Sequence, residues 1–345
     1  MKKNLTLLFL SLLTLFVNAQ EETEEKSKFS LSGSIDAYYR ANLNAPNKEG
    51  IAPGSSFANL PGFSLGMANL VASYEGEKVG FVADLVYGPR GTDAIFASPM
   101  YSATGNIVNQ LYAYWNVSDK LTLTFGNFNT FLGYEVISPT ANFNYSTSYL
   151  FSYGPFSHTG IKADYAVTED LSFMFSVMNP TDATEFNPTD TYAFGFQLGY
   201  KGQYLNLLVD HGAYELDFTG GFDISDSFYL GLNAAYFNNG EDDANELGFY
   251  GAAIYPQYTT SETFTIGLRA EYFQEINGFG AIGTAVEDSS VFAATLTGNV
   301  HIGDLTIIPE LRLDSSSDDS AYFMDADGMS QKSLSSFVLA AVYSF

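Results

Sequence analysis

The feature that most constrains this chain is an alternation of apolar and polar residues that recurs along most of its length. Residues 29–40, 79–88, 171–178 and 191–200 all follow this pattern. Successive side chains of a β-strand point to opposite faces, so alternation over about ten residues predicts strands with one apolar and one polar face. No segment sustains the 3.6-residue period of an amphipathic helix, and after residue 19 the longest unbroken apolar run is Phe337–Tyr343. The sequence therefore predicts an all-β fold.

The connections between these segments alternate in length. Short polar turns occur at residues 75–78, 118–120, 168–170, 201–203, 225–227, 260–262 and 303–304. Longer stretches fall between them, at residues 41–62, 89–106, 132–157, 179–190, 238–246, 274–290 and 315–332, with a short connection near 211–215. Short turns at one rim and long loops at the other are typical of outer-membrane barrels. The predicted fold is a transmembrane antiparallel up-and-down β-barrel.

Counting the segments that flank these connections predicts 16 strands. An even number returns both ends of the barrel to the periplasmic side. The expected strands lie near residues 29–40, 63–74, 79–88, 107–117, 121–131, 158–167, 171–178, 191–200, 204–210, 216–224, 228–237, 247–258, 263–273, 291–302, 305–314 and 333–345. Pro309 falls inside one of them, where its missing N–H predicts a bulge or a lost ladder bond.

Composition favours a membrane barrel over the alternative, a soluble β-sandwich or propeller. Charged residues make up 15% of the chain, whereas roughly 25% is usual for soluble proteins. Aromatic residues lie near the ends of predicted strands, as at Tyr39, Trp115 and Tyr200, where the interfacial girdles of a barrel are expected. The strands also have the length of a tilted bilayer crossing, about 9–11 residues, and no blade motif recurs.

The N-terminal residues have the organisation of a secretory signal peptide. Two lysines near the start precede a short apolar stretch, Leu5–Val17, and the segment ends in compact residues at Ala19. An uncleaved membrane anchor would need about 18 apolar residues or more. We therefore expect residues 1–19 to be removed, residues 20–28 to form a charged periplasmic leader, and residues 29–345 to form a barrel in the outer membrane of a Gram-negative bacterium.

Charge and cysteine content disfavour several classes of function. The chain carries 39 acidic against 14 basic residues, a formal net charge of −25, and nucleic-acid binding needs clustered Lys and Arg instead. Zero Cys excludes disulfides and thiolate metal sites. His158, His211 and His301 lack metal-ligand spacing and are expected to be structural. We expect no cofactor and no metal site, although the acidic residues 325–328 could bind divalent cations weakly beside lipopolysaccharide.

Charged residues at inward strand positions indicate what the lumen contains. If the apolar face of each strand meets lipid, the inward charges are Asp36, Arg40, Asp84, Lys162, Asp164, Asp217, Asp223, Arg269, Glu271, Glu310, Arg312 and Asp314. A dry interior would have to pair every one of them at a heavy desolvation cost, whereas a 16-stranded barrel leaves an aqueous channel. We therefore predict hydrated, pore-lining roles for Asp36, Arg40, Asp84, Lys162, Arg269, Glu271, Glu310 and Arg312. Acids outnumber bases on this face, which predicts a mild cation preference.

The third long connection, residues 132–157, differs from an ordinary extracellular loop. It is rich in aromatic and apolar residues, and its only charge is Glu135. Loops of this length without secondary structure usually have a function. We predict that it folds into the barrel and narrows the pore; the alternative packs it over the rim. The residues expected in the constriction are Tyr134, Glu135, Asn142, Tyr145 and Tyr153.

The inward arginines are expected to face this loop across the pore. Counting up from the short turns places Arg269 and Arg312 near mid-height, and closure of the barrel brings Arg40 into the same arc. Lys162 and Asp84 approach from the other side. This arrangement predicts a transverse field that would orient dipolar solutes. Alternatively, Arg269 and Arg312 form structural pairs with the glutamates two residues away.

Residues 126–177 contain a series of short motifs. They are Gly126-Asn127-Phe128, Gly133-Tyr134-Glu135, Ser138-Pro139, Asn142, Tyr145-Ser146, Tyr153-Gly154-Pro155-Phe156 and His158-Thr159-Gly160. In these motifs the chain resembles the β-barrel porin family of Gram-negative outer membranes, the OmpL-like group. The last strand, ending at Phe345, is similar to the C-terminal signal that the outer-membrane insertion machinery reads. The resemblance implies a channel-forming outer-membrane protein and no particular substrate.

These observations leave three hypotheses for function. The first is a water-filled porin for passive diffusion of small hydrophilic solutes, mildly cation-preferring. The second is a barrel plugged by its own loops that acts as a binding or structural protein. The third is an outer-membrane hydrolase, for which the sequence offers no nucleophile motif. The expected partners are outer-membrane lipids and lipopolysaccharide. The sequence does not decide between a monomer and a homo-oligomer.

Overall fold

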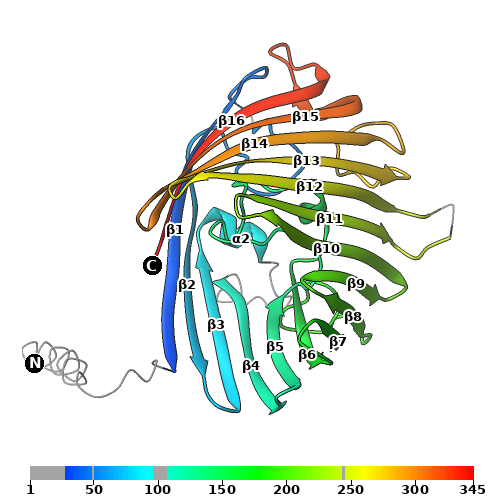
Figure 1. Ribbon diagram of the computed structural model, residues 1–345. Coiled ribbons are helices and arrows are strands. Elements are labelled where there is room, and N and C mark those ends of the chain that lie inside the picture. Colours follow the sequence, from blue (N-terminus) through cyan, green and yellow to red (C-terminus); the bar gives the residue numbers. More distant parts are fainter. Residues whose placement is uncertain (1–27, 49, 96–106, 243–244) are drawn as a thin grey trace, which may run out of the picture.

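The computed structural model describes residues 28–48, 50–95, 107–242 and 245–345, and within these ranges it shows 16 antiparallel strands closed into a barrel (Figure 1). Each strand pairs with its neighbours in the chain. The strands are β1 (Phe29–Asn42), β2 (Gly62–Glu75), β3 (Val79–Tyr87), β4 (Val108–Ser118), β5 (Leu121–Asn129), β6 (Ser157–Ala166), β7 (Leu171–Met178), β8 (Ala193–Tyr200), β9 (Gln203–Asp210), β10 (Ala213–Ser225), β11 (Phe228–Asn238), β12 (Gly248–Ser261), β13 (Phe264–Ile276), β14 (Ser290–Ile302), β15 (Leu305–Met324) and β16 (Ser330–Ser344). The predicted fold class is confirmed. The predicted signal peptide and nearly all of the leader lie outside the described residues.

The barrel closes where its first and last strands pair. β1 and β16 run antiparallel, with Tyr38 opposite Ala340. Beyond the last register pair, Gly33 and Phe345 exchange two backbone hydrogen bonds of 3.0 and 3.1 Å. Closure satisfies the backbone groups that an open sheet edge would leave unpaired, which is a condition for spanning a bilayer.

Burial follows the alternation of the sequence. Phe173 and Phe175 of β7 point outward and are 49% and 44% exposed. Ser176, the residue after Phe175, points inward and is fully buried. The outer surface of the barrel is therefore apolar and the inner surface polar, as contact with lipid requires.

Among the described residues, no helix is both long and apolar enough to cross a membrane.

The largest departure from the predicted strands lies at the long-loop rim. The sequence predicts a loop at residues 315–332, but β15 continues to Met324 and β16 begins at Ser330, so these strands form a long hairpin. Its Ser- and Asp-rich sequence lacks the apolar alternation that marks the other strands. Tertiary packing stabilises it instead, because Phe323 is fully buried in a cluster with Ile51 from the loop after β1.

Two smaller features concern the ladder. Near Pro309 the β14–β15 register is the same on both sides, at Thr297↔Glu310 and Val300↔Ile307, but the ladder is interrupted between these pairs. The missing N–H of proline thus weakens the pairing without a bulge. The connection expected near residues 211–215 is reduced to the tight turn between β9 and β10.

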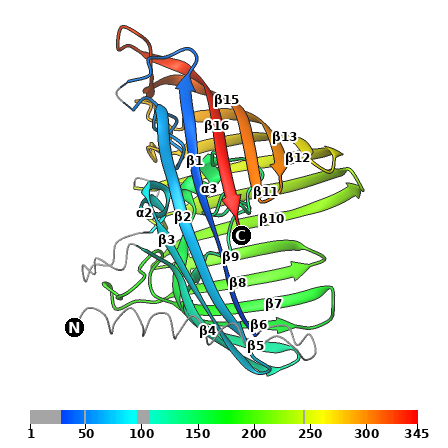
Figure 2. The same cartoon turned by 90° about the vertical axis from the view of Figure 1, so that its left-hand side faces the viewer.

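Three long connections pack inside the barrel. They are the loop between β1 and β2, the helix α2 (Pro89–Ala94) after β3, and the segment between β5 and β6 that contains the helix α3 (Tyr149–Tyr153). Phe57, Ala94 and Phe151, one from each connection, belong to a single buried cluster. Figure 1 shows α2 within the ring of strands, and Figure 2, which looks onto β1 and β16, shows α3 behind them.

Candidate channel constriction

The segment between β5 and β6, residues 130–156, crosses the lumen; we call it the lumen loop. Gly133 donates its backbone N–H to Asp217 Oδ1 of β10 over 3.1 Å. Asn144 donates its side-chain amide to Thr297 Oγ1 of β14 over 2.7 Å. The loop therefore reaches the wall opposite the strands from which it starts. The structure places it inside the barrel, where the sequence analysis expected it.

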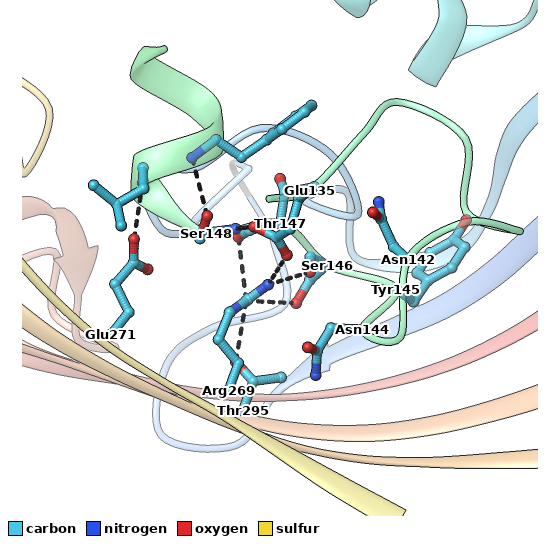
Figure 3. Close-up of polar contacts among 12 residues, drawn as sticks. Glu135, Asn142, Asn144, Tyr145, Ser146, Thr147, Ser148, Arg269, Glu271 and Thr295 are labelled. Atoms are coloured by element: carbon cyan, nitrogen blue, oxygen red, sulfur yellow. Dashed lines mark hydrogen bonds and ion pairs between the residues drawn. The ribbon is translucent and has the colours of Figure 1, made fainter. Parts of the chain in front are cut away.

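A buried ion pair fastens the middle of the lumen loop. Arg269 Nη1 of β13 lies 2.6 Å from Glu135 Oε1, and both side chains are almost completely buried. The same guanidinium donates to the carbonyl oxygens of Ser146, over 2.6 Å, and Thr147, over 3.2 Å. Figure 3 shows Arg269 between Glu135 and this stretch of loop backbone. The fork of N–H donors on arginine suits such a site, because several acceptors must be satisfied at once.

Two wall carboxylates bind the backbone N–H groups of the same stretch. Glu271 of β13 accepts from Tyr149 N over 3.0 Å and from Leu150 N over 2.8 Å. Glu310 of β15 accepts from Tyr145 N over 3.0 Å and from the side chain of Ser146. Backbone groups buried away from water need partners. Here charged wall side chains supply them in place of a β-ladder.

The short helix α3 begins at this contact. Ser148 is its N-cap and accepts a hydrogen bond from Phe151 N over 3.0 Å. The Ser148 N–H is in turn bound by Glu135 Oε2 over 2.8 Å. Glu271 binds the first two N–H groups of the helix, which have no partner within it, and its charge suits the positive end of the helix dipole.

The arginine arc exists, but it does not face water. Arg312 of β15 binds Asp314 over 2.8 Å and donates to Thr147 O over 2.8 Å. Arg40 of β1 donates to Ile51 O of the loop after β1 over 3.1 Å. With Arg269, these groups are 4% exposed or less. The three guanidinium groups therefore bind loop carbonyls and carboxylates at the positions where the sequence analysis expected a field across an open pore.

The expected pairs between neighbouring wall residues also differ. Among the described residues, Arg269 forms its ion pair with Glu135 and Arg312 forms its ion pair with Asp314, not with the glutamates two residues away. Glu271 and Glu310 instead hold the lumen-loop backbone.

The aromatic residues of the lumen loop dock on the wall. Tyr134 stacks on Tyr255 of β12, with ring centroids 4.2 Å apart, and Tyr153 Oη donates to Gly54 O over 2.9 Å. Tyr145 Oη donates to Asp36 of β1. Burial raises the pKa of the Tyr145 phenol, and the neighbouring Asp36 carboxylate raises this pKa further. The phenol therefore keeps its proton and remains a hydrogen-bond donor.

Asn142 acts within the loop. Its side-chain oxygen accepts from Val136 N over 2.9 Å, and its amide donates to Val136 O. This double contact fixes the turn at the tip of the lumen loop, residues 137–141.

The remaining predicted pore-lining residues divide between two environments. Asp84 is buried and accepts from Asn109 over 2.6 Å and from Gln110 over 3.2 Å. Lys162 and Asp164 of β6, 3.3 Å apart, keep 25% and 42% of their side-chain surface exposed. Of the eight predicted pore-lining residues, seven are buried, and Lys162 keeps a quarter of its side-chain surface exposed.

The lumen consequently has two unlike walls. We call the inward faces of β13, β14, β15 and β1 the covered wall, because the lumen loop and the loop after β1 bind there. We call the inward faces of β4 to β8 the open wall. Tyr112, Asn116, Ser172 and Gln197 point inward from the open wall and are partly exposed.

Two residues that hold the lumen loop escaped the sequence analysis. Arg90, at the start of α2, donates to Ile137 O over 2.8 Å and to Tyr145 O over 3.0 Å. Asp182, after β7, accepts from the backbone N–H groups of Phe156 and Ser157 over 2.8 and 2.9 Å. Both lie in long connections, where no periodicity shows which side chains point inward. The only signal for Arg90 was the rarity of bases in the chain.

The arrangement provides a narrowing of the lumen. Among the described residues, no group of three or more His, Cys, Asp or Glu side chains could hold a metal ion. His158 packs against Phe131 and shares a 3.0 Å hydrogen bond with Thr130, in keeping with a structural role.

Comparison with known proteins agrees with this architecture. The model of a family described as "Putative beta-barrel porin-2, OmpL-like" matches residues 28–345. The comparison with curated proteins gives no match.

Several solved structures share the fold. OmpF of Salmonella typhi in complex with daunomycin has a TM-score of 0.62 at 10% identity, covering 94% of this chain and 100% of that chain. Pseudomonas putida OprB has a TM-score of 0.61 at 10% identity, covering 92% and 94%. An anion-selective porin from Comamonas acidovorans has a TM-score of 0.59 at 12% identity, covering 93% and 100%. Identities this low show likeness of fold alone.

Proposed function

The chain belongs to the OmpL-like β-barrel porin-2 family, and from this premise we propose that it forms a water-filled channel for passive diffusion of small hydrophilic solutes across the outer membrane, with a mild preference for cations. The observation that carries the proposal is the difference between the two walls of the lumen. Buried charges fasten the lumen loop to the covered wall, and polar side chains of the open wall stay accessible opposite it. We therefore infer that solutes pass along the open wall.

The side chains of the open wall suit a wet passage. Lys162 and Asp164 are the charges on it that keep substantial exposure, and in a wide aqueous lumen such charges set ion preference. Asp223, inward on β10, is also exposed. Acids thus outnumber bases among the partly exposed inward charges of the described strands. This excess supports a mild cation preference that weakens in salt, because fields are screened within about 10 Å at 0.1 M.

Planar-bilayer recording tests the proposal. We expect discrete conductance steps and, in a KCl gradient, a reversal potential of the sign for cations. Asp164→Asn should reduce the cation preference and Lys162→Gln should increase it. If neither substitution moved the reversal potential, solutes would not pass along the open wall. An anion-selective wild-type channel would contradict the proposed selectivity.

A second candidate is a plugged barrel with a binding or structural role. The observation that favours it is that the loop after β1 and α2 also pack on the lumen loop, for example through Ser56 N and Ser152 Oγ, 2.7 Å apart. Correctly folded protein that inserts into bilayers without conductance steps would support this candidate and refute the channel.

A further inference from the structure

A cavity of about 680 Å³ lies between the tip of the lumen loop and the short-turn rim of the barrel. Its wall consists of inward residues at the ends of β11 to β16, next to the short turns, and its roof is residues 139–143 of the lumen loop. We propose that this cavity is a binding site for a neutral polyhydroxylated solute, such as a short sugar, at the short-turn end of the channel. The inference rests on the proposed function, for which it names the solute class.

Among the residues that the structure describes, the lining of the cavity carries no carboxylate, ammonium or guanidinium group. In a chain with 39 acidic and 14 basic residues, its polar side chains are hydroxyls, amides and one imidazole, including Thr140, Gln257, Thr259, Thr265, Thr306 and Ser344. An ion that leaves water needs a countercharge, which this lining does not offer. A neutral solute needs only hydrogen-bond partners, and hydroxyls and amides both donate and accept.

Three aromatic rings complete the lining: Tyr134 and Phe143 from the loop and Tyr229 from β11. Glycine makes room for the two loop rings on the wall. A Cβ at Gly231 would overlap the Tyr134 ring, and a Cβ at Gly267 would overlap the Phe143 ring. The rings are therefore fitted into the barrel at these positions. Rings offer flat apolar surface on which the C–H faces of a sugar can pack, while the phenol groups remain polar.

Several polar groups of the cavity are held in place by hydrogen bonds within the lining. Tyr134 Oη lies 3.4 Å from Tyr229 Oη, and His301 Nδ1 lies 3.1 Å from Thr306 Oγ1. Asn299 donates to Phe143 O over 3.0 Å, which ties the roof to β14. Hydroxyls and amides held this way keep further donor or acceptor capacity for a ligand. A site that hydrogen-bonds hydroxyl groups discriminates against analogues that lack them.

The size of the cavity agrees with this ligand class. Sites for small molecules commonly enclose about 300–1,000 Å³, and the cavity volume of about 680 Å³ falls within that range. A single monovalent ion would leave most of this space to water and gain no specific partner from the lining.

Current interruption by maltotriose tests the inference. We expect maltotriose added on the short-turn side to interrupt single-channel current, and gluconate, a charged polyol, to interrupt it at least about tenfold more weakly. Tyr229→Ala should weaken the binding of maltotriose about tenfold by removing a stacking ring. Tyr229→Phe, which keeps the ring, should weaken this binding by a smaller factor of about two to five, and Gln257→Ala should have an effect of the same size. Tyr258→Ala, on the outward face of β12 beside Gln257, is the matched control and should leave the interruption by maltotriose unchanged.

Calorimetric titration of the folded barrel in detergent separates this inference from the proposed channel. If maltotriose bound to a barrel that shows no conductance, the proposed binding site would be supported and the proposed channel function refuted. Conductance without maltotriose binding, or binding that is insensitive to Tyr229→Ala and Gln257→Ala, would refute the site. Tighter interruption by gluconate than by maltotriose would refute the solute class.

Discussion

The covered wall and the open wall begin from the same sequence pattern and end in different environments. Both alternate apolar and polar residues, and both place charges on the inner face. On the covered wall Arg269 and Glu271 are fully buried and bind lumen-loop backbone, whereas Lys162 and Asp164 on the open wall remain partly exposed. The strands alone do not decide whether an inward charge is hydrated. The loop that lies against them decides it.

The covered wall also shows how a loop without regular structure can be held in a lumen. Backbone groups 145–150 meet two carboxylates and two guanidinium groups of the wall. Each charge is satisfied by backbone dipoles or an opposite charge, which offsets the desolvation that burial imposes. Wall and loop therefore stabilise each other, and the difference between the two walls can be tested by changing either the loop or the wall.

Removing the loop should have the largest effect, because it turns the covered wall into a second open wall. Deleting residues 140–152 removes most of the contacts with β13 to β15, so water should reach Arg269 and Glu310 and single-channel conductance should rise. A deletion of residues 325–329, at the tip of the β15–β16 hairpin, is the control and should leave conductance unchanged. Unchanged conductance in a correctly inserted 140–152 deletion would contradict the role of the loop as a constriction.

Removing one partner of the buried ion pair should have the next largest effect. Arg269→Met leaves Glu135 buried without its countercharge, and such losses cost about 3–5 kcal/mol. Lys162→Met on the open wall breaks a half-exposed pair and should cost less than about 1 kcal/mol. Urea unfolding in lipid vesicles, followed by tryptophan fluorescence, measures both. Equal losses of unfolding free energy would show that the two walls do not differ as described.

A smaller effect is expected where the lumen loop contacts β1. Tyr145→Phe removes the phenol that donates to the buried Asp36 carboxylate, and hydrogen bonds to charged groups contribute about 1.5–3 kcal/mol. Tyr112→Phe, at a partly exposed inward position on β4, should change the free energy of unfolding by less than about 0.5 kcal/mol. The same unfolding assay measures the difference, and a Tyr145→Phe protein as stable as wild type would show that Asp36 does not depend on this donor.

The sequence predicted the barrel well because the periodicity of strands and the lengths of connections are local. It predicted the inward direction of Arg269 and Glu310 for the same reason. It could not predict their burial, because that depends on contacts between β13 or β15 and a loop more than 120 residues earlier. The same holds for Arg90 and Asp182, whose roles follow from where a loop ends in space. The long β15–β16 hairpin was missed since packing on another loop, not alternation, stabilises it.

The smallest effect expected is a pH dependence at the end of the lumen loop. Burial raises the pKa of Asp182 to about 6, above its ordinary value of about 3.9. The folded state therefore holds this proton over a pH range in which the unfolded state has lost it. The stabilisation that results is complete below about pH 4 and is lost as pH rises through about 6.

Asp182→Asn cannot titrate, and its amide oxygen can still accept from the backbone N–H groups of Phe156 and Ser157. Relative to wild type, the variant should gain on the order of 1–2 kcal/mol of unfolding free energy between pH 4 and pH 7, an amount reduced by the partial exposure of the side chain. Asp164→Asn on the open wall is the comparison, and the largest change with pH should belong to Asp182→Asn. A difference between Asp182→Asn and wild type that stays constant across this range would show that the Asp182 carboxyl group titrates as it does in the unfolded chain.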